Sequence, residues 1–426
     1  MLARTFARSR FLAFLTLPAC TGAPLVFPDP APVSSTVESP VLPPTEANAD
    51  PLPPPAPLED PSAPPYASKT PELAHFHAAL NELERGKTSR HVRVLWLGDS
   101  HGQADFWSGQ LRKQLQARFG AAGPGFLHLG YKNYRHDGIK LDIQGKWRMR
   151  PKKPVGISKQ DDGVFGLGGL MMSGYADTPR VELTLNEPLA SSAQYDICYR
   201  FNEKGDAIAY AIDGARETTV FEKDGALGAL AHLPLQGKAS GPLVVRPIGR
   251  TDLCGVVVET DPKKSPGAIV DTLAINGARY GTMLAWDETS WALEVERRAP
   301  DLVILELGTN EAGDGTPAYG KVSAQVGELL GRVRKSGKPT DCVVVSSTDR
   351  ADAETRTTKM HDTLREAAKR EGCLWFDPWQ ILGGEGAMAR LRDEPEPKVQ
   401  PDGIHLTIKG YRGLGSAMFD ALLKGY

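Results

Sequence analysis

Two short stretches of the sequence carry the side chains that a serine-based reaction needs. Residues 98–100 read Gly-Asp-Ser, and Asp402 and His405 lie three positions apart in a loop before the last expected helix. A nucleophilic serine needs a base that takes its proton and a carboxylate that orients the base. A spacing of three across a turn can bring Asp402 to one ring nitrogen of His405 and leave the other nitrogen free for Ser100. Each stretch alone is also typical of an ordinary turn, the first with Ser100 as a helix N-cap.

Two further residues could donate hydrogen bonds to the oxyanion that forms when a serine attacks a carbonyl group. Asn310 follows the apolar run 301–307, and Gly277 follows the run 268–275. An amide side chain and a backbone N–H are suitable donors for such a charge. Ligands of open α/β sheets bind at the carboxyl ends of strands, where Ser100 also lies. Taken alone, Asn310 and Gly277 are typical of turns.

Five apolar runs predict the strands that position these residues. The run 91–97 enters the turn at 98–100, which is typical of a buried parallel strand that feeds a tight turn. Apolar residues at helical spacing follow several of the runs. Alternating strands and helices predict a doubly wound α/β fold with a parallel sheet. The expected strands span residues 91–97, 268–275 and 301–307 and begin at Cys342 and Cys373, and the last helix is expected over 411–423.

A stretch of different character, residues 139–264, interrupts this pattern. Apolar and polar residues alternate over short runs there, for example at 181–185 and 195–199, and glycine-rich turns separate the runs. This alternation is typical of strands with one buried face, as in an antiparallel sandwich. We therefore predict a β-sandwich domain that is inserted into an α/β domain formed by residues 67–138 and 265–426.

Together and in this order, these residues resemble the conserved blocks of the SGNH/GDSL hydrolase superfamily. The resemblance runs from about Arg90 to the C-terminus, without the insertion. The four matching blocks are residues 98–101 for the nucleophile, Gly277 for the single glycine, residues 308–312 for the asparagine and residues 402–405 for the terminal block.

The resemblance implies a role for each residue. Ser100 would be the nucleophile, His405 its general base and Asp402 the carboxylate that orients the base. The oxyanion would be bound by the backbone N–H groups of Ser100 and Gly277 and by the side chain of Asn310. A reaction of this kind needs no metal and no organic cofactor.

Two departures from the common pattern of the superfamily narrow the expected substrate. His101 stands where the GDSL name has leucine, and Glu311 replaces an aspartate. Both are similar to the branch that contains peptidoglycan O-acetylesterases, some of which carry a carbohydrate-binding-like β-domain where this insertion falls. We expect Asp99 to support the nucleophile turn, together with His101 and Glu311. The backbone should point His101 away from the reaction, so its expected role is structural or a substrate contact.

The resemblance therefore predicts a serine esterase that removes O-acetyl groups from peptidoglycan or another acetylated polysaccharide. Two alternatives use the same sequence features. A polysaccharide O-acetyltransferase would pass the acetyl group from Ser100 to a sugar hydroxyl instead of water. A catalytically inactive lipoprotein would use only the β-insertion, as a glycan-binding module.

The N-terminus predicts export and a lipid anchor. Residues 1–20 contain three arginines, a short apolar core and the segment 17–20, Leu-Pro-Ala-Cys, which resembles a bacterial lipobox with Cys20 as the lipidated residue. Residues 21–66 are crowded with proline and should form an extended, mostly disordered tether. We expect a lipid-anchored protein of the bacterial cell envelope, on the periplasmic face or the outer membrane. The alternative is a plain signal peptide with an incidental cysteine.

The overall charge does not point to a nucleic-acid partner. The chain has 50 basic and 52 acidic residues, a formal net charge of −2, and no long basic run stands out. A basic patch or stripe is the usual electrostatic footprint of a nucleic-acid binder. The expected partners are therefore an acetylated glycan and, through the lipid, a membrane.

Four cysteines remain after Cys20 and suggest either disulfide bonds or buried free thiols. Their order in the sequence favours the pairs Cys198–Cys254 and Cys342–Cys373, and an even number in an exported chain is compatible with disulfides. The sequence has no Cys-x-x-Cys pair and no His/Cys cluster that would suggest a metal site.

Several aromatic residues could stack on sugar rings, but such residues more often pack in a core. These residues are Trp107, Trp147, Tyr175, Trp286 and Trp291.

Overall fold

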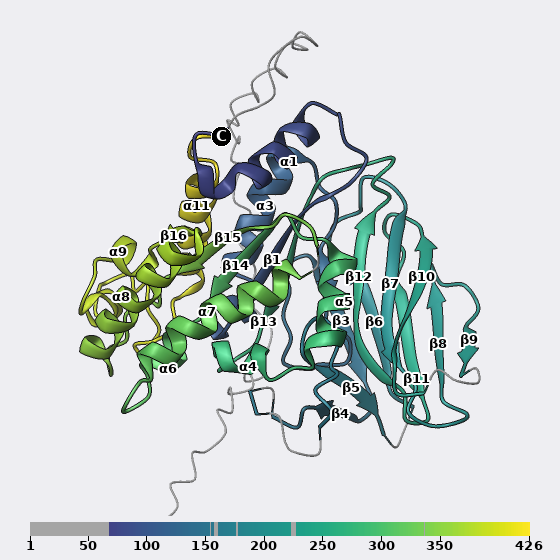
Figure 1. Cartoon of the computed structure of the whole chain (residues 1–426). Coiled ribbons are helices and arrows are strands. Elements are labelled where there is room, and N and C mark those ends of the chain that lie inside the picture. Colours follow the sequence, from purple (N-terminus) through teal and green to yellow (C-terminus); the bar gives the residue numbers. More distant parts are fainter. Residues whose placement is uncertain (1–67, 154, 157–160, 176–177, 223–226, 336) are drawn as a thin grey trace, which may run out of the picture. The chain divides into compact units, whose positions relative to one another are not determined.

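A computed structural model describes residues 68–153, 155–156, 161–175, 178–222, 227–335 and 337–426 (Figure 1). The expected signal peptide, the proline-rich linker and the lipidation of Cys20 lie outside these residues. Among the described helices, none combines the length and the apolar character needed to cross a membrane.

Five strands form a fully parallel sheet. They are β1 (Val92–Gly98), β13 (Ala268–Ala274), β14 (Leu302–Glu306), β15 (Asp341–Val345) and β16 (Leu374–Phe376). Their spatial order is β13-β1-β14-β15-β16, so the strand that leads to Ser100 has neighbours on both sides. Both faces of the sheet are covered, so side chains on both sides of each strand are buried. This is why the strands are continuous apolar runs in the sequence. This confirms the predicted α/β fold.

Helices cover both faces of the parallel sheet (Figure 1). The longer ones are α1 (Ala74–Glu84), α3 (Trp107–Phe119), α5 (Glu288–Arg298), α7 (Tyr319–Arg334), α8 (Glu354–Glu371) and α11 (Ile408–Leu422). The shorter ones are η1 (Pro71–Leu73), α2 (Ser100–Gln103), α4 (Tyr280–Leu284), α6 (Thr309–Ala312), α9 (Pro378–Leu382) and α10 (Ala387–Arg392). Successive side chains of a strand point to opposite faces. On β1, Val94 and Trp96 therefore pack with α1, α3 and α11, whereas Leu95 and Leu97 pack with α5, α7 and α8.

Two antiparallel sheets lie beside the parallel sheet and share an apolar core. The first contains β2 (Gly125–Leu127), β4 (Trp147–Arg150), β5 (Met171–Gly174), β7 (Ala193–Arg200), β10 (Leu230–Gly237) and β12 (Asp252–Thr260). The second contains β3 (Ile139–Gln144), β6 (Arg180–Leu185), β8 (Ala207–Ile212), β9 (Thr218–Phe221) and β11 (Leu243–Ile248). Ile197 from the first sheet and Val245 from the second belong to one buried cluster, which confirms the predicted β-sandwich.

The strand orders show how the sandwich is tied to the α/β part. They are β10-β7-β12-β5-β4 in the first sheet and β3-β6-β11-β8-β9 in the second. In addition, β2 pairs with β12 although it precedes residue 139, where the insertion was expected to begin. The alternation of apolar residues could not reveal this short strand, because its three residues are all buried.

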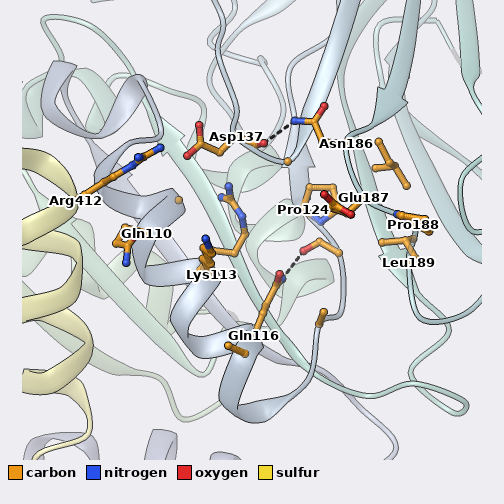
Figure 2. Close-up of a pocket in the computed structure, with 17 residues that line it drawn as sticks. Gln110, Lys113, Gln116, Pro124, Asp137, Asn186, Glu187, Pro188, Leu189 and Arg412 are labelled. Atoms are coloured by element: carbon orange, nitrogen blue, oxygen red, sulfur yellow. Dashed lines mark hydrogen bonds between the residues drawn. The ribbon is translucent and has the colours of Figure 1, made fainter. Parts of the chain in front are cut away.

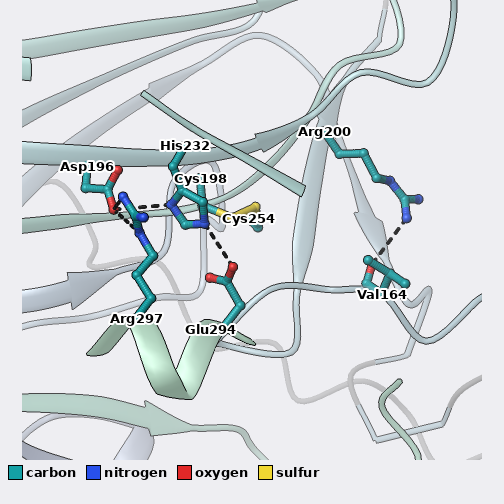
Figure 3. The surroundings of a disulfide bond; sticks show 8 residues. All are labelled: Val164, Asp196, Cys198, Arg200, His232, Cys254, Glu294 and Arg297. Atoms are coloured by element: carbon teal, nitrogen blue, oxygen red, sulfur yellow. Dashed lines mark hydrogen bonds and ion pairs between the residues drawn. A yellow bond between two sulfur atoms is a disulfide. The ribbon is translucent and has the colours of Figure 1, made fainter. Parts of the chain in front are cut away.

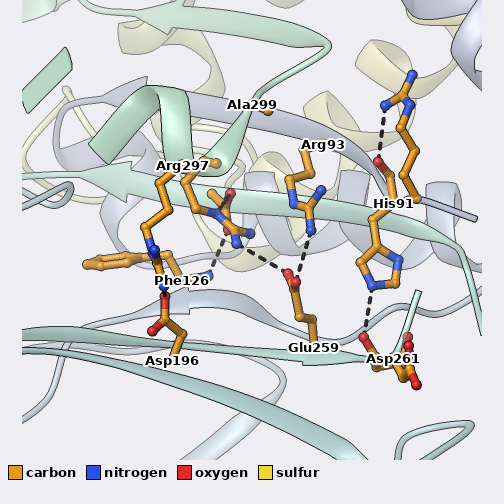
Figure 4. Close-up of polar contacts among 12 residues, drawn as sticks. His91, Arg93, Phe126, Asp196, Glu259, Asp261, Arg297 and Ala299 are labelled. Atoms are coloured by element: carbon orange, nitrogen blue, oxygen red, sulfur yellow. Dashed lines mark hydrogen bonds and ion pairs between the residues drawn. The ribbon is translucent and has the colours of Figure 1, made fainter. Parts of the chain in front are cut away.

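A buried ion-pair network joins the two sheet systems. Arg298 of α5 donates two hydrogen bonds to Asp271 of β13, at 2.9 and 3.0 Å, and one to Glu259 of β12 at 3.2 Å. Glu259 also accepts a hydrogen bond from Arg93 of β1 at 2.9 Å (Figure 4). Burial alone raises the pKa of Glu259, but the two guanidinium groups outweigh this and hold the pKa below its usual value. The two arginines thus keep Glu259 ionised inside the protein.

Replacing Arg298 by alanine is expected to lower the free energy of unfolding by about 3–5 kcal/mol, because the buried carboxylate of Asp271 loses its cation. Arg297→Ala is the matched control. Arg297 is the preceding residue of α5, but its side chain is 45% exposed and pairs with Asp196 near the surface. Its loss should cost at most about 1 kcal/mol. Urea unfolding followed by circular dichroism measures both variants, and equal small losses would contradict the role given to the network.

Two disulfide bonds are present in the structure. Cys198–Cys254 joins β7 to β12 (Figure 3), and Cys342–Cys373 joins β15 to the residue before β16. Both pairs are the ones that the sequence order favoured, so the free-thiol alternative is wrong. The bonds span 56 and 31 residues, and cross-links over such separations stabilise a protein mainly by restricting its unfolded chain.

Candidate active site

Ser100 lies at the carboxyl end of β1, as the first residue of the short helix α2. Asp99 caps this helix, because its side chain accepts a hydrogen bond from the backbone N–H of His101 at 2.9 Å. Gly98 is closely packed, since a Cβ atom there would lie 2.3 Å from Oε2 of Glu306 and 2.9 Å from Nε1 of Trp96. The tight turn therefore depends on a neighbouring strand as well as on its own residues.

His405 and Asp402 come from a turn before α11. Oδ1 of Asp402 accepts the backbone N–H groups of Ile404 at 2.9 Å and His405 at 3.0 Å, and the turn passes through Gly403 at a φ of +68°. A positive φ of this kind favours glycine. The turn thereby holds the carboxylate beside the imidazole of the same segment. Thr407 then caps α11 by accepting the N–H of Gly410.

The three side chains form a continuous hydrogen-bonded chain. Nδ1 of His405 lies 2.7 Å from Oδ2 of Asp402, and Nε2 of His405 lies 2.8 Å from Oγ of Ser100. Because an ionised carboxylate can only accept, the proton of the neutral imidazole belongs on Nδ1, and Nε2 accepts from the Ser100 hydroxyl. This geometry can move a proton from Ser100 to His405 when the hydroxyl attacks an electrophile.

The electrostatics of Asp402 suit an orienting carboxylate. Partial burial raises its pKa, but hydrogen bonds from His405 and from the N–H of Ile404 outweigh this, so the pKa of Asp402 lies below its usual value. Asp402 is therefore ionised throughout the neutral pH range. The side chains of Asp402 and His405 are 44% and 31% exposed, so the pair is open to a substrate from outside.

The expected oxyanion donors differ in their availability. Among the described residues, none accepts a hydrogen bond from the backbone N–H of Ser100 or Gly277. Asn310, by contrast, uses both hydrogens of its amide nitrogen, which donates to Oδ2 of Asp99 at 3.1 Å and to the carbonyl of Ala278 at 3.0 Å. The structure thus leaves the two backbone donors open, and Asn310 connects the nucleophile turn to the glycine turn. Its donation to an oxyanion stays a prediction.

Three buried carboxyl groups lie in and around the nucleophile turn. Burial raises the pKa of Asp99 to about 6 and that of Glu311 to about 7, and burial together with the charge of Asp99 raises the pKa of Glu306 well above its usual value. Oε2 of Glu306 accepts the backbone N–H of Asp99 at 3.2 Å, and Oε1 of Glu311 accepts that of Tyr280 at 2.9 Å. Glu306 was not among the site residues predicted from the sequence. Its signal was a carboxylate at the end of an otherwise apolar run.

His101 is buried and belongs to the scaffold. It is 1% exposed, its Nδ1 lies 2.9 Å from the hydroxyl of Tyr411, and its Nε2 lies 3.2 Å from that of Thr348. Burial lowers its pKa to about 3, with a further contribution from the nearby charges of His405 and Arg350. Of the two roles expected for His101, the structural one fits this environment and substrate contact does not.

The aromatic candidates divide into two groups. Trp107, Trp286 and Trp291 are 1–3% exposed and belong to the core. Trp147 is partly buried against the sandwich core, whereas Tyr175 is 41% exposed. Only these last two are placed to meet a ligand.

One group of possible metal ligands is found among the described residues, formed by Cys198, His232 and Glu294. The sulfur of Cys198 is bonded to Cys254, so it offers no thiolate (Figure 3). Burial lowers the pKa of His232, but its hydrogen bonds to Asp196 and Glu294 outweigh this and raise the pKa to about 9. A protonated histidine donates to both carboxylates and does not ligate a metal. The group is better described as an ion-pair cluster.

A hollow of about 730 Å³ lies beside α3 and the loop 185–189 (Figure 2). Lys113 and Arg412 line one side, and Asn186 and Glu187 line the other. Ser100 is not among its lining residues. The candidate triad is therefore not approached through this hollow.

Comparisons with known proteins agree with the fold. Residues 257–412 match the model of the GDSL-like lipase/acylhydrolase family. A search of curated proteins finds no match. A solved peptidoglycan O-acetylesterase is similar over 84% of this chain and 96% of its own, with 20% identity and a TM-score of 0.68. A family two carbohydrate esterase from Clostridium thermocellum matches over 67% of this chain and 99% of its own, with 11% identity and a TM-score of 0.28.

The matched residues include Gly277, Asn310, Asp402 and His405. Ser100 lies outside the match, but it follows β1, which pairs with the matched strand β13. The parallel sheet, with the four sequence blocks at the carboxyl ends of its strands, agrees with the resemblance of the sequence to SGNH/GDSL hydrolases. Residues 257–412 therefore match the GDSL-like lipase/acylhydrolase family, and the chain shares its fold with the solved peptidoglycan O-acetylesterase.

Proposed function

We propose that this protein is an envelope-located serine esterase that removes O-acetyl groups from peptidoglycan or another acetylated polysaccharide. The observation that carries the proposal is the hydrogen-bonded chain from Ser100 through His405 to Asp402, within an SGNH-type domain. The acetylated glycan is supported by the fold likeness to a peptidoglycan O-acetylesterase, which extends over the inserted sandwich as well as the α/β part.

The chemistry follows from the geometry of the triad. Oγ of Ser100 attacks the acetyl carbonyl carbon, while Nε2 of His405 takes the hydroxyl proton and Asp402 stabilises the resulting imidazolium. The carbonyl oxygen becomes an oxyanion, for which the backbone N–H groups of Ser100 and Gly277 are the open donors. The bond to the sugar oxygen breaks, and His405 returns the proton to that oxygen. Water then attacks the acetyl-serine with His405 again as base, which releases acetate and restores Ser100.

The location is proposed from the N-terminus alone. Residues 1–20 resemble a lipoprotein signal peptide that ends at Cys20, and residues 21–66 are rich in proline. A lipid on Cys20 and an extended tether would let the folded domain act away from the membrane surface.

Acetate release from an O-acetylated glycan tests the function. The full chain should release one acetate for each ester lost from O-acetylated peptidoglycan, and its kcat/KM on chromogenic esters should fall about tenfold or more from acetyl to octanoyl. Acetyl groups that appear on an added glycan acceptor, instead of free acetate, would contradict hydrolysis and favour a transferase. Glycan binding without any loss of ester would favour a purely binding protein.

A further inference from the structure

The edge of the first antiparallel sheet carries a strip of basic and aromatic side chains. Two hollows, of about 460 and 320 Å³, adjoin the β4–β5 hairpin, and Tyr175 lines both of them. The segment 146–153, which includes β4, holds five basic residues. We call five of the exposed side chains of this region the hairpin strip. It consists of Lys132, Arg148, Lys152, Lys153 and Tyr175.

The two hollows receive different side chains of β4, because successive residues of a strand point to opposite faces. Arg148 and Arg150 line the larger hollow, whereas Trp147 and Met149 line the smaller one. Tyr175 follows β5 and lies between them, with the guanidinium group of Arg148 4.6 Å from its ring centre. One exposed aromatic ring and one cation are thus held together at the junction.

The cations of the hairpin strip are available to a ligand. Within the described part of the chain, no carboxylate pairs with Arg148, Lys132, Lys152 or Lys153.

The acidic residues of the larger hollow are already engaged in ion pairs. Asp252 is 2% exposed and binds Arg150 at 3.0 Å, and nearby Glu203 pairs with Arg250 at 2.9 Å. The free charge of the hairpin strip is therefore positive.

The hairpin strip continues towards the nucleophile. Val155 lies 3.5 Å from the place where a Cβ atom of Gly277 would be, and Gly277 is one of the two open oxyanion donors. Arg150 is five residues before Val155, so the chain separates them by at most about 18 Å. A glycan bound along the hairpin could therefore reach Ser100 within a few sugar rings.

We propose that the hairpin strip binds a carboxylate-bearing stretch of a polysaccharide and presents its acetylated sugar to Ser100. The guanidinium group of Arg148 suits a carboxylate because it donates two parallel hydrogen bonds, and the lysines add charge along the chain. Tyr175 offers an exposed apolar surface to a sugar ring. Concave hollows beside an aromatic residue favour a polymer strand over a membrane surface. The presentation to Ser100 rests on the proposed function, whereas the binding does not.

Binding to matched glycans tests this site. The protein is the full chain with Ser100→Ala, so that no ester is lost during the titration. The probes are soluble fragments of a carboxylate-bearing, O-acetylated glycan, and the same fragments with their carboxyl groups converted to neutral amides. Arg148→Glu should weaken binding of the acidic fragments about tenfold or more, and amidation of the glycan should do the same to the unsubstituted strip.

Two variants make the result independent of one substitution. Lys152→Glu combined with Lys153→Glu changes two exposed residues of the hairpin strip without touching Tyr175, and should weaken binding in the same direction. Lys140→Glu is the matched control, because Lys140 is an exposed cation on β3, the edge strand of the other antiparallel sheet. It should leave binding unchanged.

Several outcomes would overturn the proposal. The proposal is wrong if neither Arg148→Glu nor Lys152→Glu with Lys153→Glu weakens glycan binding. It is also wrong if Lys140→Glu weakens binding as much as they do. In either case the hairpin strip would be a charged sheet edge without a ligand. Binding of anionic phosphatidylglycerol vesicles, with none of the fragments, would make it a membrane contact. The two proposals fail separately. Fragments that bind through the strip but lose no acetate contradict only the proposed esterase, whereas acetate release with a strip that binds nothing contradicts only this inference.

Discussion

Replacing Ser100 by alanine is expected to lower kcat/KM for chromogenic acetate hydrolysis by about 10⁴- to 10⁶-fold, because the variant loses the only atom that can form the acyl-enzyme in the proposed mechanism. Nε2 of His405 then faces a methyl group, 2.8 Å from where the hydroxyl oxygen was, and has no proton to take. Residual activity should come from water activated by His405 or from binding alone. The measurement is initial rates on the full chain at neutral pH.

Ser416→Ala is the control for this variant. Ser416 lies in α11 and its hydroxyl accepts a hydrogen bond from Gln110 at 3.3 Å, outside the triad. It should keep almost all activity. Ser100→Ala removes one oxygen atom and should leave stability unchanged, which thermal unfolding of the three proteins checks. Activity that persists in Ser100→Ala would remove the serine mechanism.

Replacing Asp402 by asparagine is expected to lower kcat by about 10³- to 10⁴-fold. Asparagine keeps an oxygen for the N–H groups of Ile404 and His405, so the turn should survive. Its NH₂ group, however, comes to lie against Nδ1 of His405 in place of a carboxylate oxygen. The imidazole then carries its proton on Nε2, which faces Ser100 as a donor and cannot accept the hydroxyl proton.

A combined variant tests whether the triad acts as a unit. Ser100→Ala with Asp402→Asn should be no less active than Ser100→Ala alone, because the losses of residues in one proton path do not add. Asp393→Asn is the matched control, since Asp393 is 69% exposed and pairs only with Arg392 among the described residues. Independent, multiplicative losses in the combined variant would mean that Asp402 contributes by a route other than His405.

The apolar runs of the sequence were sufficient to predict the parallel sheet. The run 91–97 predicted β1 to within one residue at each end, because a strand that is buried on both faces must be apolar throughout. The last helix begins at Ile408, three residues before its expected start, because Thr407 caps it and a cap is a weaker signal than periodicity. The disulfide pairing followed from the order of the cysteines, but only the two S–S bonds of the structure exclude the free thiols.

The candidate site was predictable in its members but not in its supporting contacts. The order of the four blocks indicated Ser100, Asp402 and His405, and the structure brings these side chains together. The burial of Glu306 beneath Gly98, and the contacts of His101 with Tyr411, depend on which strands and helices become neighbours. No local pattern encodes these contacts, since the partners are distant in the sequence. For the same reason, the two acceptors of the Asn310 amide could not be predicted from the sequence.

The order of the strands in the parallel sheet has a consequence for biogenesis. β1, which carries the nucleophile turn, pairs with β13 and β14, and both of these follow the entire insertion. During synthesis, the N-terminal part of the α/β domain emerges first, and β1 has to stay unpaired until residue 268 arrives. The sandwich strands, whose partners are closer in the chain, can associate earlier. Closing such distant pairs slows folding, so this protein needs its first strand to be protected from aggregation before its chemistry can exist.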